Sequence, residues 1–168
     1  MKNAKQRNAG IFLAQGGMVA ALYVALTLIA SAMGLASGQI QLRLSEALTI
    51  LPCFFPAAVP GLFVGCLLAN LLTGCVLWDV AVGSLATLLG ALGTRLLRKN
   101  RWLAVLPPIV SNILLVPPVL VWAYGVEESI PLLMLTVGLG EVLSCGVLGE
   151  LMYSALDKRR ALWDRKDR

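Results

Sequence analysis

The sequence contains no histidine, and only 14% of its 168 residues are charged. Without histidine, a Ser-His or Cys-His nucleophile, a histidine proton shuttle and a histidine-ligated metal are all excluded. The pattern G-x-x-x-x-G-K-[ST] is also missing from the chain, so it has no P-loop for ATP phosphates. Any ATP-driven activity therefore needs a motor on another subunit.

Cysteine is sparse, and no two cysteines form a C-x-x-C pair. This spacing argues against a thioredoxin-like redox site and against a zinc ribbon. Free cysteine commonly behaves as a small buried hydrophobe. We expect buried, unreactive thiols and neither a metal site nor a cofactor; the thiols are Cys53, Cys66, Cys75 and Cys145.

Apolar residues dominate what is present: 58% of the chain is hydrophobic and the mean hydropathy is +0.82. A soluble domain of this size has too little interior to hide so much apolar surface. A lipid bilayer can cover the apolar surface that the protein interior cannot. The composition therefore predicts an integral membrane protein, and the length predicts a single domain over residues 1–168.

Six apolar runs predict an all-α bundle of six transmembrane helices. A spanning helix needs about 20 mainly apolar residues. The second run is the shortest, so it must be tilted, re-entrant or shielded by its neighbours. The first run is too long for a signal peptide, and we expect it to be a retained helix. The runs lie near residues 11–34, 46–56, 58–77, 80–97, 103–124 and 132–154.

Basic residues cluster before the first run, after the fourth run and in the C-terminal tail. Basic loops favour the cytoplasmic side of a membrane. If the second run crosses, all three clusters lie on one side, whereas Asp79, Glu127 and Glu128 lie on the other. Six crossings are therefore favoured, with both termini in the cytoplasm.

Polar residues within or at the edges of the runs are the candidate site. An ionisable group is costly in lipid, so its presence suggests a function. Glu141 lies about ten residues inside the sixth run, roughly 15 Å along a helix. In the predicted topology the candidates fall in the outer half or near the midplane, which predicts a pocket open to the outside. They are Glu46, Asn70, Asp79, Asn112 and Glu141.

Structural explanations compete for most of these residues. Arg43 and Glu46 have the i, i+3 spacing of a weak helical ion pair. Asp79 has the position of a helix N-cap, and the two asparagines could form hydrogen bonds between helices. Glu141 has no cation three or four residues away, so it is the strongest candidate.

Small residues recur every four positions in three runs, and such spacing lets helix backbones approach closely in a membrane. Packing within the bundle is the expected role of most of them. The series are Ala21 and Ala25; Gly61, Gly65 and Ala69; and Ala86, Gly90 and Thr94.

Several strings in combination identify a family. The chain resembles, over essentially its whole length, the QueT family of substrate-binding S components of energy-coupling factor (ECF) transporters. The strings are Tyr23-Val24-Ala25-Leu26-Thr27, Gly38-Gln39-Ile40-Gln41, Arg43-Leu44-Ser45-Glu46-Ala47-Leu48, Pro60-Gly61-Leu62-Phe63-Val64-Gly65-Cys66 with Ala69-Asn70, Asp79-Val80 with Gly83-Ser84-Leu85-Ala86-Thr87-Leu88, and Gly140-Glu141.

The resemblance implies a six-helix S-component fold in the plasma membrane of a bacterium. It implies uptake of a queuosine precursor, a 7-deazaguanine such as pre-queuosine-1 or queuine, and no enzymatic activity. The implied partners are a transmembrane T component and two ATPase subunits. Ala21 and Ala25 look like the A-x-x-x-A motif by which S components dock on the T component.

Our hypothesis for the ligand follows from its chemistry. A guanine-like edge offers adjacent N–H donors to one carboxylate, and an aminomethyl cation favours a second, roles that Glu46 and Glu141 can fill. One of the two asparagines would read the carbonyl group. Gln39, Gln41 and Arg43 would form a lid. Trp78 or Tyr124 would stack on the ring, although an interfacial aromatic belt is the commoner use of such residues.

Three other functions remain open. The first is a stand-alone secondary carrier of a small nitrogenous solute, with Glu141 as the ion-coupling residue. The second is a small intramembrane enzyme, which the missing histidine and the lack of a paired nucleophile and base disfavour. The third is an assembly factor without a small ligand.

Overall fold

Helices account for all the regular structure in residues 2–35 and 42–158, the part that this computed structural model describes; side chains are described from residue 6 onward. The elements, in chain order, are α1 (Lys2–Ala32), η1 (Leu44–Cys53), α2 (Ala58–Leu72), α3 (Leu77–Leu96), α4 (Arg101–Ala104), α5 (Leu106–Tyr124), α6 (Ile130–Glu141), η2 (Val142–Leu148) and α7 (Gly149–Asp157).

Four helical stretches of the described chain are long and apolar enough to cross a membrane: Gln6–Ala32, Leu77–Leu96, Arg101–Tyr124 and Ile130–Asp157. The helices η1 and α2 are apolar but shorter. The prediction of an all-helical membrane protein is confirmed, and each predicted run coincides with a helix or a helical stretch. The fifth run is divided into α4 and α5, and the sixth comprises α6, η2 and α7.

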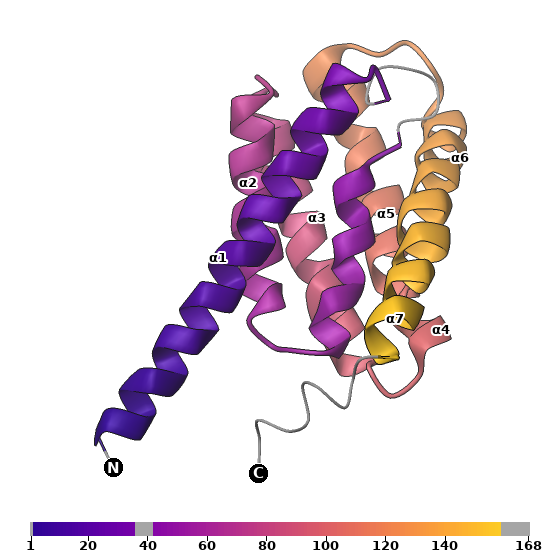
Figure 1. The fold of residues 1–168 in the computed structure, drawn as a ribbon. Helices are drawn as coiled ribbons and strands as arrows, with labels where there is room; N and C mark the ends of the chain where they lie inside the picture. Colours follow the sequence, from indigo (N-terminus) through magenta and orange to yellow (C-terminus); the bar gives the residue numbers. More distant parts are fainter. Residues whose placement is uncertain (1, 36–41, 159–168) are drawn as a thin grey trace.

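The short second run forms a helix that its neighbours surround. η1 is a 3-10 helix, whose rise of about 2.0 Å per residue makes ten residues reach about 20 Å. Seven of its ten residues are buried. It packs against α1, α2, α3, α7 and η2, and it is the unlabelled purple helix between α1 and α6 in Figure 1. Of the three alternatives for this run, the structure therefore has the shielded one.

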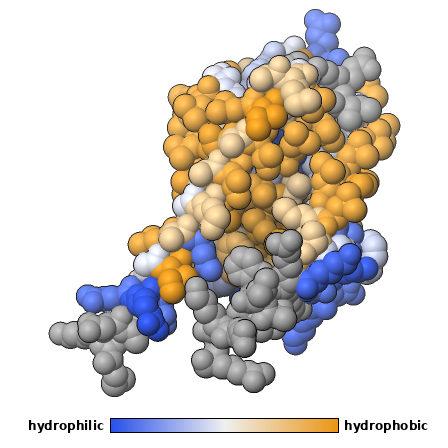
Figure 2. Space-filling model, in the orientation of Figure 1, coloured by the Kyte–Doolittle hydropathy of each residue, from blue (hydrophilic) through white to orange (hydrophobic). Residues whose placement is uncertain are grey.

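The remaining long helices form an arc around η1. Neighbours along the arc are α1 and α2, α2 and α3, α3 and α5, and α5 and α6. The first turn of α1, helix α4 and the last turn of α7 lie at the same end of the molecule (Figure 1). Figure 2 shows a hydrophobic body with most hydrophilic residues at that end and a smaller group at the opposite end, as expected for a protein embedded in a bilayer.

Arginines fix the helix ends on this hydrophilic side. Arg95 Nη1 donates a hydrogen bond to the carbonyl oxygen of Pro52, 2.8 Å away, and so holds the end of η1 against α3. Arg101 Nε lies 3.0 Å from Glu150 Oε1, which joins α4 to α7. At this end of the molecule these contacts join the helices that carry the site described below.

Glycines set the closest helix contacts. A Cβ atom on Gly65 would lie 2.7 Å from Tyr23 Cβ, and one on Gly61 would lie 2.6 Å from the carbonyl oxygen of Gly16, so α1 and α2 touch here through glycine. A Cβ on Gly90 would lie 2.6 Å from Pro108 Cα, where α3 meets α5. The predicted packing role is confirmed for these three glycines.

The alanine pair in the first helix lies elsewhere. Ala20 and Tyr23 of α1 are buried, whereas Ala21 and Ala25 are exposed. A Cβ on Gly17 of the same helix would meet no atom within 4 Å. Ala21 and Ala25 therefore take no part in packing of the described bundle and lie on an open face of α1.

Candidate ligand-binding site

Two carboxylates from distant parts of the chain meet inside the bundle. Glu46 lies near the start of η1 and is fully buried, and Glu141 is the last residue of α6 and is 4% exposed. One carboxylate oxygen from each and the Sγ atom of Cys145 all lie within 4.8 Å of one another. The two glutamates that the sequence singles out thus share one buried cluster.

Glu46 is held by one of its two oxygens. The hydroxyl of Tyr23 donates a short hydrogen bond to Glu46 Oε1, and Thr87 Oγ1 lies 3.4 Å from the same oxygen. Glu46 Oε2 is buried and, among the described residues, has no hydrogen-bond partner. Since an unpaired buried polar atom costs about 1–3 kcal/mol, this oxygen is suited to accept a hydrogen bond from a guest molecule.

Glu141 lies where the helix changes its winding. The segment after it, η2, is a π-helix, a rare geometry that occurs often at functional sites. Cys145 lies four residues later and donates a hydrogen bond of 3.2 Å to Glu141 Oε2. Cys145 is also 3.4 Å from Thr49 Oγ1 of η1, so its thiol lies at the contact between the π-helix η2 and the 3-10 helix η1.

The amide of Asn112 completes the cluster from α5. The residue is fully buried, and its side chain interacts with the Glu141 carboxylate. Neither its nitrogen nor its oxygen has a hydrogen-bond partner of normal geometry among the described residues. The Asn112 amide therefore approaches Glu141 of α6 across the helix interface and retains hydrogen-bonding capacity for a guest.

Arg43 and Asp79 lie toward the predicted outer side. Arg43 is half-buried at the start of η1, and its charge interacts with those of Asp79, Glu141 and Glu46. Asp79 is 5% exposed and accepts a hydrogen bond of 2.9 Å from the Tyr124 hydroxyl. The N-cap interpretation of Asp79 is wrong, because α3 begins at Leu77 and Asp79 lies within its first turn.

Asn70 lies beside Asp79 rather than beside the glutamate pair. Its Nδ2 atom is 3.6 Å from Cys66 Sγ of the same helix. A Cβ on Gly83 would lie 3.1 Å from Asn70 Nδ2 and 3.5 Å from Asp79 Oδ1. Glycine at position 83 therefore leaves room for both polar side chains between α2 and α3.

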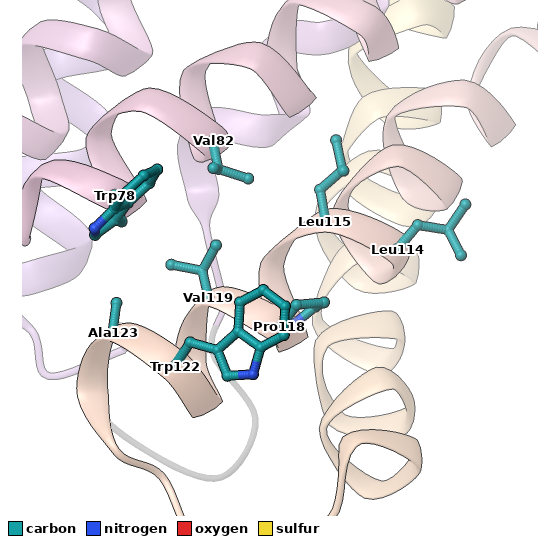
Figure 3. Close-up of a pocket in the computed structure, with 8 residues that line it drawn as sticks. All are labelled: Trp78, Val82, Leu114, Leu115, Pro118, Val119, Trp122 and Ala123. Carbon is teal, nitrogen blue, oxygen red and sulfur yellow. The ribbon is translucent and has the colours of Figure 1, made fainter.

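The structure does not bring Trp78 to this cluster. Its ring is 71% exposed at the start of α3. Together with Trp122, which is 85% exposed, it borders an apolar groove of about 440 Å³ between α3 and α5. Figure 3 shows Trp78 and Val82 facing Pro118 and Val119 across this groove. Gln39 and Gln41 lie outside the described residues.

Sequence reasoning missed three residues of the cluster. Cys145 was expected to be an unreactive core thiol, yet it contacts Glu141, and the spacing Glu141-x-x-x-Cys145 places both on one helix face. Tyr23 and Thr87 were noted only as part of family strings, although both carry a hydroxyl within an apolar run. Of the four cysteines, Cys66 and Cys145 are buried and the other two are only half-buried.

The chemistry of the cluster is that of a binding site for a polar guest. The charges of three buried carboxylates, those of Glu46, Asp79 and Glu141, interact with the guanidinium of Arg43. Unpaired buried charge is costly, so the cluster favours a cationic or hydrogen-bond-donating partner. A polar centre within an apolar helical bundle is typical of membrane proteins that bind or move a solute.

The family comparison names that class more closely. A family model described as QueT transporter matches residues 13–158, which is most of the chain. The protein belongs to the QueT transporter family, and the resemblance inferred from the sequence strings is confirmed. Its role is therefore transport rather than catalysis. No curated protein and no solved structure matches the chain.

Proposed function

We propose that this protein is the substrate-binding S component of an ATP-driven ECF importer and that it binds a 7-deazaguanine queuosine precursor from outside the cell. The observation that carries the proposal is the meeting of Glu46 and Glu141 in one buried cluster that also holds unpartnered polar atoms. The bundle would be of the six-helix S-component type in a bacterial plasma membrane, with both termini in the cytoplasm.

The ligand's hydrogen-bonding groups complement this cluster. A guanine-like edge has two adjacent N–H donors, which one carboxylate accepts in parallel. The second carboxylate would then face the aminomethyl cation of pre-queuosine-1 or the ammonium group of queuine. Asn112, whose nitrogen and oxygen have no hydrogen-bond partner of normal geometry among the described residues, offers a donor to the ring carbonyl group.

The first test replaces Glu141 by Gln, which keeps the shape and removes the charge. A hydrogen bond to a charged group contributes about 1.5–3 kcal/mol, and 1.4 kcal/mol corresponds to about tenfold in affinity. We expect Glu141→Gln to weaken binding of pre-queuosine-1 at least tenfold in a calorimetric titration of the purified protein. Glu128→Gln, in the exposed loop before α6, is the matched control and should bind normally.

The second test varies the ligand instead of the protein. A 7-deazaguanine that carries a nitrile in place of the aminomethyl group keeps the guanine edge but has no cation. If one carboxylate faces the ammonium group, the nitrile compound should bind at least tenfold more weakly to the natural protein. Equal affinity for both compounds would refute a carboxylate that faces the ammonium group, and unchanged affinity of Glu141→Gln would remove Glu141 from the ligand site.

The proposed partners are a T component and two ATPase subunits. The exposure of Ala21 and Ala25 on α1 supports a docking face for the T component, because small residues allow close helix contacts in lipid. Uptake into liposomes should require all partners together with ATP. Uptake by the chain alone, driven by a proton or sodium gradient, would instead establish the secondary-carrier alternative.

A further inference from the structure

We propose that the cluster of Glu46, Glu141 and Cys145 also binds one thiophilic divalent cation, of the Zn²⁺ or Cd²⁺ type, with Asn112 as a fourth donor. The sequence analysis expected no metal site because histidine is absent and no C-x-x-C pair exists. The proposed site instead combines carboxylates with a single thiol, and neither absence excludes that combination.

The distances between the donor atoms suit a small cation. Metal–sulfur distances of about 2.3 Å and metal–oxygen distances of about 2.0–2.2 Å place tetrahedral donors roughly 3.3–3.8 Å apart. Cys145 Sγ already lies 3.2 Å from Glu141 Oε2, and the donor atoms of all three residues lie within 4.8 Å of one another. A shift of about 1 Å in the Glu46 side chain would therefore close the site around a cation.

The backbone pre-arranges two of the donors. Glu141 and Cys145 are four positions apart at the junction of α6 and η2. This is the i, i+4 spacing by which one helix face presents two metal ligands. Glu46 approaches from η1, where Thr49 also contacts Cys145. The three donors thus come from η1 (Glu46), the end of α6 (Glu141) and η2 (Cys145).

Unpartnered atoms provide an independent indication of a ligand. Asn112 is fully buried, its side chain interacts with Glu141, and neither its nitrogen nor its oxygen has a hydrogen-bond partner of normal geometry in the described part of the chain. Its Oδ1 atom is thus available as a fourth donor. Glu46 Oε2 is likewise buried without a described partner.

The charge of the donors selects the kind of cation. Coordination requires a thiolate, so the Cys145 proton would leave to solvent as the metal–sulfur bond forms. Two carboxylates and a thiolate carry three negative charges, and the Arg43 guanidinium, whose charge also interacts with that of Asp79, offsets only part of them, so the donors favour a divalent cation over a monovalent one. Sulfur ligation favours zinc or cadmium over magnesium and calcium, which prefer oxygen ligands.

The cation would share its donors with the organic ligand, and this competition alone rests on the proposed function. The probe is CdCl₂, added to the chelator-treated, full-length protein in detergent, and the readout is the ultraviolet charge-transfer absorption of cadmium thiolate. We expect saturation at one equivalent, loss of the band in Cys145→Ser, and at least tenfold weaker binding in Glu141→Gln. Cys75→Ser is the control and should retain the band.

Each outcome decides a separate point. A band that persists in Cys145→Ser, or the absence of a saturable band from the natural protein, would overturn the metal site. Because Glu141→Gln keeps the thiol, unchanged cadmium affinity in this variant would also overturn it, even if Cys145→Ser failed to fold. A Cys145-dependent band that saturating pre-queuosine-1 leaves unchanged would refute the competition while the metal site stands.

Discussion

A single methyl group at the contact between α1 and α2 should disturb the site without touching it. Gly65 lies where α2 meets α1, and its replacement by Ala places a Cβ atom 2.7 Å from Tyr23 Cβ and 3.0 Å from Ala20 Cα. Ordinary contacts of this kind begin at 3.4 Å, so the helices must separate by about 0.7 Å at this point. Tyr23, whose hydroxyl holds Glu46, moves with α1.

The expected loss of stability in Gly65→Ala follows from overpacking of the contact between α1 and α2. Extra methyl groups in a well-packed interior typically cost about 1–3 kcal/mol. Replacement of glycine by alanine within a helix also gains up to about 1 kcal/mol, which partly offsets this cost. Gly17→Ala provides the same gain without the clash, since no atom lies within 4 Å of its new Cβ. The difference between the two variants therefore isolates the overpacking.

The assay compares both variants by reversible unfolding in mixed detergent micelles and by titration with pre-queuosine-1. Gly65→Ala should be about 1–3 kcal/mol less stable than Gly17→Ala. It should also bind the ligand more weakly, because the displaced Tyr23 orients Glu46 less well. If Gly65→Ala matched Gly17→Ala in both measurements, the close contact of α1 and α2 and its link to Glu46 would be refuted.

Two further substitutions test the hydroxyl donor and the docking face. Among the described residues, Tyr23→Phe leaves Glu46 Oε1 with the 3.4 Å contact from Thr87 alone. Loss of a charge-assisted hydrogen bond worth about 1.5–3 kcal/mol should lower ligand affinity about tenfold or more in a titration. Unchanged affinity would show that Tyr23 takes no part in ligand binding. The double variant Ala21→Leu with Ala25→Leu should keep normal ligand affinity, because both residues are exposed, but should no longer co-purify with the T component. Co-purification at the natural level would place the docking face elsewhere.

The helices could be predicted from the sequence because lipid imposes a simple rule: backbone polar groups must be satisfied within the segment that crosses. Apolar runs therefore coincide with helices, including the short second run. The geometry of that run could not be predicted, since a 3-10 helix of ten residues persists through contacts with α1, α3 and α7. The residues of the run do not indicate which helices will pack against it.

The glutamate pair could be predicted from its cost in lipid, but its partners could not. A carboxylate in an apolar run is conspicuous, whereas a cysteine or a tyrosine in the same run resembles ordinary core. The surroundings of Asp79 and Trp78 could not be predicted either. The sequence suggested that Asp79 caps a helix and that Trp78 stacks on a ligand. In the structure the Tyr124 hydroxyl donates a hydrogen bond to Asp79, and Trp78 borders an apolar groove. Both arrangements depend on residues of α5.

The two irregular helices connect fold and site. A 3-10 helix and a π-helix both have less favourable backbone geometry than an α-helix, and irregular backbone in a membrane is tolerated where protein covers it or where it lines a polar site. Here η1 and η2 contact each other, and Glu46 and Cys145 lie on them while Glu141 borders η2. If the irregular winding served only packing, lengthening of η1 by one apolar residue would leave ligand binding intact. Because that insertion would rotate Glu46 away from Glu141, we expect it to abolish binding instead.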